Sequence, residues 1–210
     1  MSEFKLADGE KVLFTGDSIT DAGRRGEFAP YGRGYVSKAI ELVTAKYPER
    51  TIAYVNTSIG GHTVRELGPR WQEDAIAHQP DWLSVMIGIN DVHRFINSVP
   101  ENKVDVLEYE DTYRRMLVAA REQTKARLIL MESFYLSTDP DHVSIQTLTK
   151  YLEVVHRLAE EFDALLVPVQ QDFQKALKVR PAEKWSEDNV HPFPEGHMLI
   201  ALSWLRTMGW

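Results

Sequence analysis

The stretch Val12-Leu13-Phe14-Thr15-Gly16-Asp17-Ser18 predicts the fold of this chain. Residues 12–15 form a continuous apolar and β-branched run, which is typical of a strand covered on both faces of a sheet. Asp17 and Ser18 follow at once, where α/β sheets usually place their chemistry, at the carboxyl end of a strand. The same residues are common in turns that end a strand and open a helix. This stretch alone therefore leaves a catalytic and a purely structural interpretation open.

Similar apolar runs follow along the chain, separated by helical patterns. The further runs are residues 52–55, 82–87, 128–131 and 165–167, and the helical patterns are residues 36–47, 109–120 and 148–162. A last helix is expected to begin near Pro194 and to bury Met198, Leu202 and Leu205. Strands that alternate with helices indicate right-handed βαβ crossovers. The sequence thus predicts a three-layer α/β/α sandwich with a central parallel sheet of about five strands, in an order that the pattern does not specify.

Length and composition favour a single domain with a net negative charge. The chain has 210 residues, and no linker or repeat divides it, so residues 1–210 are expected to form a single domain. The net charge is −7, which argues against general binding to nucleic acid or to anionic membranes. The chain has no cysteine and therefore no disulfide, thiolate metal site or cysteine nucleophile. Acidic residues near the N-terminus do not resemble a signal peptide, and a cytoplasmic protein is expected.

Three more polar segments are expected at the carboxyl edge of the sheet. They are residues 56–63, which contain the pair Gly60-Gly61, residues 88–91 and residues 188–192. The first two can also be ordinary turns, and a lone histidine such as His191 is often only a surface residue. However, Asp188 and His191 are three residues apart, close enough for a carboxylate to bond an imidazole. Their position at one edge favours a site.

Together these segments contain every part of a serine hydrolase. A serine hydroxyl needs a base, and an imidazole base benefits from a carboxylate that fixes its tautomer. Ser18, His191 and Asp188 can take these roles. The oxyanion of an acyl-transfer intermediate needs hydrogen-bond donors. The backbone N–H groups of Ser18 and Gly61 and the side-chain amide of Asn90 are suitable.

The motifs resemble a known family. Residues 14–21 resemble the first block of the GDSL, or SGNH, hydrolases, and the loop ending at Gly61, residues 88–91 and residues 188–192 resemble the other three, in the family's order. The resemblance implies a flavodoxin-like fold without a required metal or cofactor. It also implies that Ser18 is the nucleophile, His191 the base and Asp188 its orienter, with Ser18, Gly61 and Asn90 as the oxyanion hole. Asp17 is expected only to fix its loop.

Three residues depart from common hydrolase patterns. Ser58 stands where the family's second block often has glycine, so the path of that loop can differ. His62 stands where asparagine or aspartate is frequent, and no catalytic role is assigned to it. Thr20 breaks the G-x-S-x-G nucleophile elbow, which disfavours a conventional α/β-hydrolase.

Within the family the chain resembles the intracellular acetyl-xylooligosaccharide esterases. The resemblance is carried by Gly34-Tyr35-Val36, Asn56, Thr63-Val64-Arg65, Pro80-Asp81-Trp82, residues 86–92 and Val190-His191-Pro192. It implies removal of acetyl groups from a small or oligosaccharide ester. Four aromatic residues near the motif loops can offer apolar faces to sugar rings, although packing in the core is the alternative: Tyr35, Phe95, Trp185 and Phe193.

Other functions remain open at this stage. A thioesterase or lysophospholipase-like hydrolase would use the same triad with a different acyl pocket. A non-catalytic carbohydrate-binding relative would have no need of a nucleophile beside its base. A metal hydrolase is disfavoured, because His191 and His197 are poorly spaced for shared ligation and no H-E-x-x-H motif is present. Residues 204–210, with surface aromatics, allow self-association into a homo-oligomer.

Overall fold

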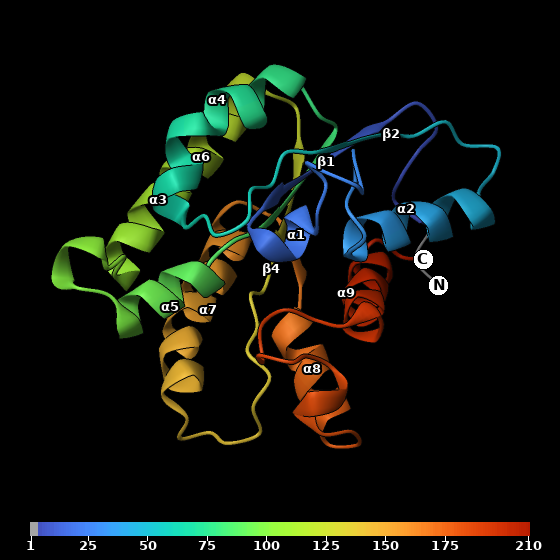
Figure 1. Cartoon of the computed structure of the whole chain (residues 1–210). Coiled ribbons are helices and arrows are strands. Elements are labelled where there is room, and N and C mark those ends of the chain that lie inside the picture. Colours follow the sequence, from blue (N-terminus) through green and yellow to red (C-terminus); the bar gives the residue numbers. More distant parts are fainter. Residues whose placement is uncertain (1–3) are drawn as a thin grey trace.

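The structure is built on a five-stranded sheet in the order β2-β1-β3-β4-β5, seen in a computed structural model that describes residues 4–210 (Figure 1). The strands are β1 (Lys11–Gly16), β2 (Ala53–Asn56), β3 (Trp82–Met86), β4 (Arg127–Met131) and β5 (Leu165–Val167). Every pairing is parallel, and each strand overlaps the apolar run that predicted it. The predicted α/β/α sandwich is confirmed. Residues 1–3 of the expected domain lie outside the described residues.

Helices cover both faces of the sheet (Figure 1). On one face α2 (Tyr35–Lys46) packs against α9 (Pro194–Thr207), with α8 (Val169–Leu177) beside α9. The other face carries α3 (Val64–Leu67), α4 (Trp71–Asp74), α5 (Ile89–Asn97), α6 (Val106–Gln123) and α7 (Val143–Glu161). Single 3-10 turns are Gly68–Arg70, Ile76–His78, Pro100–Asn102 and Ala182–Lys184. The short helix α1 (Ser18–Asp21) follows β1.

The end of β1 lies at the point where the chain changes sides of the sheet. The connection after β1 runs to β2 on one flank, and the next returns to β3 on the other, which makes the crevice at β1 and β3 the usual ligand site. Gly16 pairs with Met86 there, with a φ of 153°. A Cβ atom at Gly16 would lie 2.0 Å from the Met86 carbonyl oxygen. Only glycine therefore lets β1 end this close to β3.

The helices differ from the prediction both in their number and in the residues that they bury. In α9, Leu205 is buried as expected, but Met198 and Leu202 are half-exposed, and the buried face is instead formed by Ile200, Ala201, Trp204 and Leu205. Apolar residues surround much of this helix, so their spacing alone permits more than one buried face. The sequence also did not predict α8, and it treated residues 88–91 as a loop although α5 begins within them.

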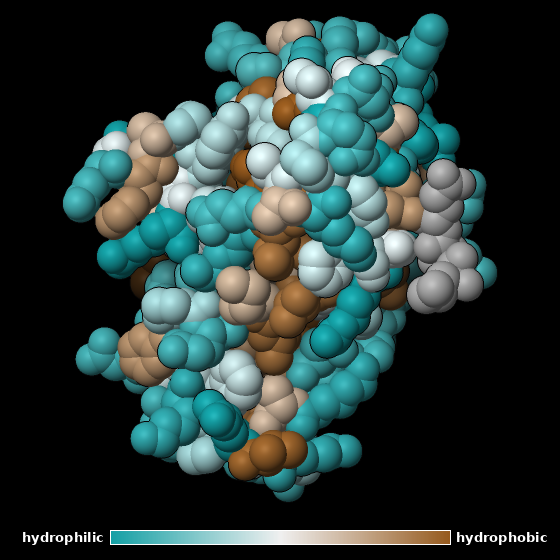
Figure 2. Space-filling view, turned by 90° about the vertical axis from the view of Figure 1, so that its right-hand side faces the viewer, coloured by the Kyte–Doolittle hydropathy of each residue, from teal (hydrophilic) through white to brown (hydrophobic). Residues whose placement is uncertain are grey.

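The side of the molecule on which α2 and α9 lie carries an apolar strip among hydrophilic residues (Figure 2). Near it, α8 and α9 border a groove of about 400 Å³ whose apolar lining includes Trp185, Met198, Leu199 and Leu202. Among the helices of residues 4–210, none combines the length and the apolar character needed to cross a membrane.

Candidate active site

Ser18 is the first residue of α1 and is placed by the end of β1. Asp17 caps this helix, because its Oδ1 accepts the Ile19 N–H at 3.0 Å. The serine Oγ lies 2.9 Å from Nε2 of His191, a residue 173 positions away in the sequence. The last loop therefore folds back beside the first strand, as the proposed pairing of serine and histidine required.

The loop from Ser186 to Pro192 presents histidine and aspartate as one unit. Ser186 and Pro192 form an isolated antiparallel bridge that closes the loop. Asp188 Oδ1 accepts the backbone N–H groups of Val190 and His191 at 3.0 and 2.7 Å, and its Oδ2 lies 2.6 Å from His191 Nδ1. Asp188 is thus fixed by its own loop as well as by the imidazole.

These contacts determine the tautomer of His191. An ionised carboxylate can only accept, so the hydrogen shared with Asp188 is on Nδ1, and Nε2 is left to accept the Ser18 hydroxyl proton. Burial alone would raise the pKa of Asp188, but hydrogen bonds from the side chain and backbone of His191 and from Val190 hold it well below its usual range. The carboxylate therefore stays ionised wherever the imidazole is needed.

The glycine loop and the start of α5 bring hydrogen-bond donors to the other side of Ser18. A Cβ atom at Gly60 would lie 3.6 Å from Ser18 Cβ, so this loop passes directly beside the serine. Gly61 follows with a φ of 82°. Asn90, in the first turn of α5, donates one hydrogen of its amide to the His62 carbonyl at 3.0 Å. The second hydrogen of that amide remains for another acceptor.

The glycine loop, residues 56–63 with Gly60 and Gly61, is held by further polar residues. These residues were not singled out in the sequence analysis. Asp21 Oδ2 accepts the Gly60 N–H at 3.0 Å. Arg94 donates to the Gly61 carbonyl at 3.2 Å and to Glu66, which in turn forms a capping box with Thr63. The T-x-x-E pattern of residues 63–66 is a recognised helix-start signal and was the available clue to Glu66.

The residues that depart from the family pattern are also placed. Ser58 is fully buried and bonds Asn56 within the loop. His62 contributes its backbone carbonyl to Asn90, while its Nδ1 has no partner within residues 4–210. Burial, together with the charge of Arg70, lowers the pKa of His62. Its ring is therefore neutral near pH 7, and its visible role is to orient Asn90.

Burial strongly raises the pKa of two carboxyl groups beneath this edge, Asp17 and Asp91, and neither takes part in the hydrogen bonds that join Ser18, His191 and Asp188. Asp17 is 1 % exposed, and its Oδ2 has no partner in the described part of the chain. Burial raises the pKa of Asp17 to about 7 against the opposing hydrogen bond from Ile19. Asp91 accepts the Val64 N–H with its carboxylate, and burial raises its pKa to about 8. Both groups position backbone rather than face the reaction.

A cavity of about 620 Å³ opens beside Ser18 and His191. It is lined by α1, by the loop after it and by the start of α9, with Phe28, Arg33 and Phe193 among its residues. This size is ordinary for a small-molecule site.

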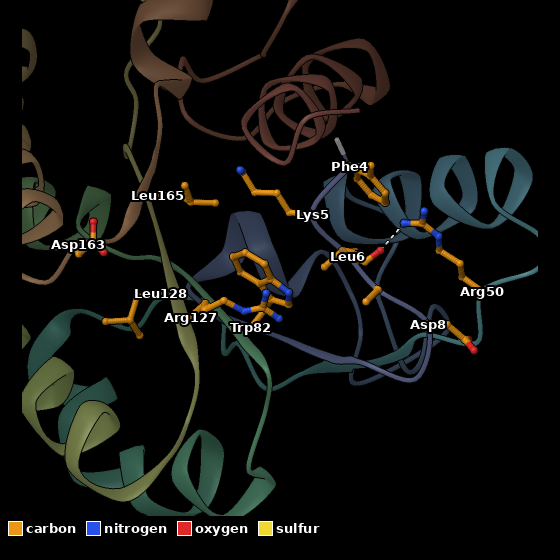
Figure 3. Close-up of a pocket in the computed structure, with 11 residues that line it drawn as sticks. Phe4, Lys5, Leu6, Asp8, Arg50, Trp82, Arg127, Leu128, Asp163 and Leu165 are labelled. Carbon is orange, nitrogen blue, oxygen red and sulfur yellow. Dashed lines mark hydrogen bonds between the residues drawn. The ribbon is translucent and has the colours of Figure 1, made fainter. Parts of the chain in front are cut away.

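A larger cavity, of about 730 Å³, lies at the opposite edge of the sheet (Figure 3). Its lining includes Trp82 and Arg127, at the starts of β3 and β4, with the guanidinium carbon 3.9 Å from the centre of the indole ring. It contains none of the predicted site residues.

The aromatic residues expected near the motifs have different positions. The prediction that Tyr35 offers its ring to a sugar is wrong, because the side chain is fully buried and its hydroxyl bonds Thr20. Trp185 packs against Phe173 and lines the groove between α8 and α9. Phe95 faces Lys103 rather than the cavity beside Ser18. Of the four, Phe193 alone lines that cavity.

The sandwich and its carboxyl edge define a serine hydrolase that lacks the nucleophile elbow of conventional α/β-hydrolases. Residues 14–199 match the GDSL-like Lipase/Acylhydrolase family, and the chain belongs to that family. It is a carboxylic ester hydrolase, as the motifs predicted.

The chain is similar along nearly its whole length to characterised members. The acetylxylan esterase of Geobacillus stearothermophilus is 42 % identical over 98 % of this chain and 96 % of that protein. The crystal structure of that esterase, Axe2, has a TM-score of 0.93 and matches 98 % of this chain and 97 % of that one. Structures with a TM-score of at least 0.93 include Axe2 catalytic mutants in which a serine, an aspartate or a histidine is replaced by alanine. Thioesterase 1/protease 1/lysophospholipase L1 of Escherichia coli (strain K12) is 25 % identical over 94 % of this chain and 83 % of that protein.

Proposed function

We propose that this esterase removes acetyl groups from carbohydrate, such as acetylated xylooligosaccharides, with Ser18, His191 and Asp188 as its catalytic triad. The observation that carries the proposal is the unbroken line of hydrogen bonds from Ser18 Oγ through His191 to Asp188. Similarity to an acetylxylan esterase supports the substrate class.

In the acylation step, Ser18 Oγ attacks the acetyl carbonyl carbon while His191 Nε2 accepts the hydroxyl proton. Asp188 stabilises the imidazolium that forms without taking its proton. The tetrahedral intermediate then collapses, the bond to the sugar oxygen breaks, and His191 returns the proton to that oxygen. Water repeats the sequence on the acetyl-serine and releases acetate, which restores the free serine.

We propose that three donors stabilise the oxyanion of the tetrahedral intermediate: the backbone N–H groups of Ser18 and Gly61 and the side-chain amide of Asn90. The first two have no hydrogen-bond acceptor within residues 4–210, and the third has one hydrogen to spare. Fixed donors of this kind are effective because they need no reorganisation when the negative charge develops.

Replacement of Ser18 tests the proposal. We expect Ser18→Ala to lower kcat on acetylated xylooligosaccharides by about 10⁵ to 10⁶, since the nucleophile and base act as one unit. Ser98→Ala, at a half-buried serine after α5, is the matched control and should keep wild-type turnover. Ser18→Ala protein that still binds the oligosaccharide but does not release acetate agrees with the assignment. Turnover near the wild-type rate would contradict it.

A thioesterase or lysophospholipase activity is the alternative, supported by similarity to the Escherichia coli enzyme. A series of p-nitrophenyl esters from acetyl to octanoyl separates the two. We expect kcat/KM to be greatest for the acetyl ester; a preference for octanoyl would favour the alternative.

Three further expectations are proposals about the whole molecule. We propose that residues 1–210 form one domain, which the single sheet and its continuous core support. We propose that the chain forms a homo-oligomer, supported by the apolar strip on the side of α2 and α9 (Figure 2). Light scattering would report the oligomer, and a single monomer mass at assay concentration would contradict it. The cytoplasmic location stays a prediction, which fractionation of the source cells would test.

A further inference from the structure

The cavity beside Ser18 and His191 lies on the leaving-group side of the reaction. His191 Nε2 must return its proton to the oxygen that leaves, so the alcohol has to lie next to the imidazole. The lining of this cavity contains Ser18 and His191 but neither Gly61 nor Asn90. The space is therefore adjacent to the base, and its lining does not include the oxyanion donors Gly61 and Asn90.

Two aromatic side chains in this lining are unusual for the molecule. Phe28 and Phe193 are each 37 % exposed, and within the described residues 4–210 every other phenylalanine, tyrosine and tryptophan is buried or half-buried. Both line the cavity that contains Ser18 and His191. A partly exposed aromatic ring in the wall of a cavity is suited to contact the apolar face of a ligand.

The backbone that carries each ring is held by hydrogen bonds. The loop that carries Phe28 is tied back to α1, because Gly32 donates to the Phe28 carbonyl at 2.7 Å and Arg33 to the Ala22 carbonyl at 3.0 Å. Gly32 has a φ of 78°, and a Cβ there would lie 2.3 Å from the Asp21 carbonyl oxygen. The backbone of the loop that carries Phe28 is therefore shaped by a position that only glycine fits.

Phe193 is fixed in a similar way at the start of α9. Its N–H donates to the Trp185 carbonyl at 2.7 Å, and its carbonyl accepts the His197 N–H at 3.0 Å. Pro192 and Pro194 flank it and restrict its backbone further. The backbone at both aromatic residues is therefore restrained before a ligand arrives, which lowers the entropic cost of binding.

Charged groups in the same lining suit hydroxyl groups better than an acyl chain. Glu27 and Arg33 both border the cavity, and neither has a salt bridge within the described part of the chain. The Arg33 guanidinium lies 5.2 Å from the centre of the Phe28 ring. The imidazole of His197 is also present. Burial, with the charges of Lys38 and Arg33, lowers its pKa to about 4, so it is neutral near pH 7 and can accept a hydrogen bond from a hydroxyl group.

From this combination we propose that Phe28 and Phe193 form the subsite for the sugar that leaves, with Glu27 and Arg33 as partners of its hydroxyl groups. A pyranose ring has an apolar C–H face and a rim of hydroxyl groups. The apolar face matches the two phenylalanine rings, and the hydroxyl groups match the carboxylate of Glu27 and the guanidinium of Arg33. These residues thus determine the preference for a carbohydrate alcohol over a simple one. The inference rests on the proposed function, because it specifies the alcohol that the same serine releases.

The test compares two leaving groups in Phe28→Ala, Phe193→Ala and the double variant. We expect kcat/KM on acetylated xylooligosaccharides to fall about threefold to tenfold for each single change, the usual worth of an aromatic contact, mainly through KM. On methyl acetate, whose alcohol is too small to cover either ring and has no sugar hydroxyls, kcat should stay within about twofold. Phe28→Tyr and Phe193→Tyr should restore the oligosaccharide activity. Phe95→Ala, at an aromatic residue outside the cavity, is the matched control.

Binding gives a readout that does not depend on turnover. In Ser18→Ala protein, calorimetry with xylotriose as the probe should show weaker binding when Phe28 or Phe193 is also replaced. Equal losses on both esters, or oligosaccharide kinetics unchanged in the double variant, would overturn the subsite while leaving the proposed function intact. A wild-type enzyme that hydrolyses p-nitrophenyl acetate but no acetylated oligosaccharide would instead overturn the proposed substrate.

Discussion

Replacing Asp17 with asparagine should make the stability of this enzyme less dependent on pH. Burial raises the pKa of Asp17 from its ordinary value of 3.8 to about 7. Below about pH 4 both the folded and the unfolded chain hold the proton. Between about pH 4 and 7 the unfolded chain releases it and the folded chain retains it, so the free energy of unfolding falls as pH rises.

The expected magnitude follows from the shift. About three pH units at about 1.4 kcal/mol each give a cost near 4 kcal/mol, complete above about pH 7. Asparagine is as good a helix cap as aspartate and carries no charge, so Asp17→Asn keeps the bond to Ile19 and avoids this cost. The variant should match the wild type at pH 4 and exceed its free energy of unfolding increasingly up to pH 7.

Urea unfolding at half-unit pH steps measures the difference between the two proteins. Asp91 is present in both proteins, and because burial is the main cause of its raised pKa and the charge of Asp17 a smaller one, most of its contribution cancels. Asp111→Asn, at a side chain 71 % exposed, is the matched control and should change the pH dependence little. Parallel curves for wild type and Asp17→Asn from pH 4 to 7 would refute the reasoning, since they would mean that the buried carboxyl ionises as easily as it does in the unfolded chain.

Three other substitutions have definite expected outcomes. Asp188→Asn should lower kcat by about 10⁴, because an amide can hold His191 in the wrong tautomer, and near-normal turnover would remove Asp188 from the triad. Asn90→Ala should lower kcat by about 10²–10³ with little change in KM; a change in KM alone would indicate a binding role. Gly16→Ala should lower the free energy of unfolding by more than about 3 kcal/mol in urea titrations, because its Cβ would meet the Met86 carbonyl oxygen, and a stable variant would show that β1 and β3 can separate.

The central strands β1, β3 and β4 were predictable because they are buried on both faces. A strand buried on both faces has apolar or β-branched residues at successive positions, as in residues 12–15, and all four of these side chains are fully buried. The helix α9 was less predictable, since apolar residues on several sides leave its buried face undefined until β5 and α2 are in place. For the same reason Met198 was expected in the core and lies half-exposed.

The candidate site was predictable where its chemistry is carried by short motifs. Ser18, Asp188 and His191 could be named because each belongs to a local pattern, and the structure brings all three together. Arg94 was not named, since its two contacts join separate segments and leave no local pattern. Phe28 was missed because an exposed aromatic residue in a loop carries no periodic signal.

Most of the chain lies between the two residues that form the serine–histidine bond, because Ser18 belongs to the first strand connection and His191 to the last. Esterase activity is therefore a sensitive reporter of complete folding. In a refolding experiment, activity cannot return before the segment that contains α9 has docked against α2. A fragment cleaved just before Ser186 would lose base and orienter together, and adding back the terminal peptide offers a way to reconstitute the enzyme from two pieces.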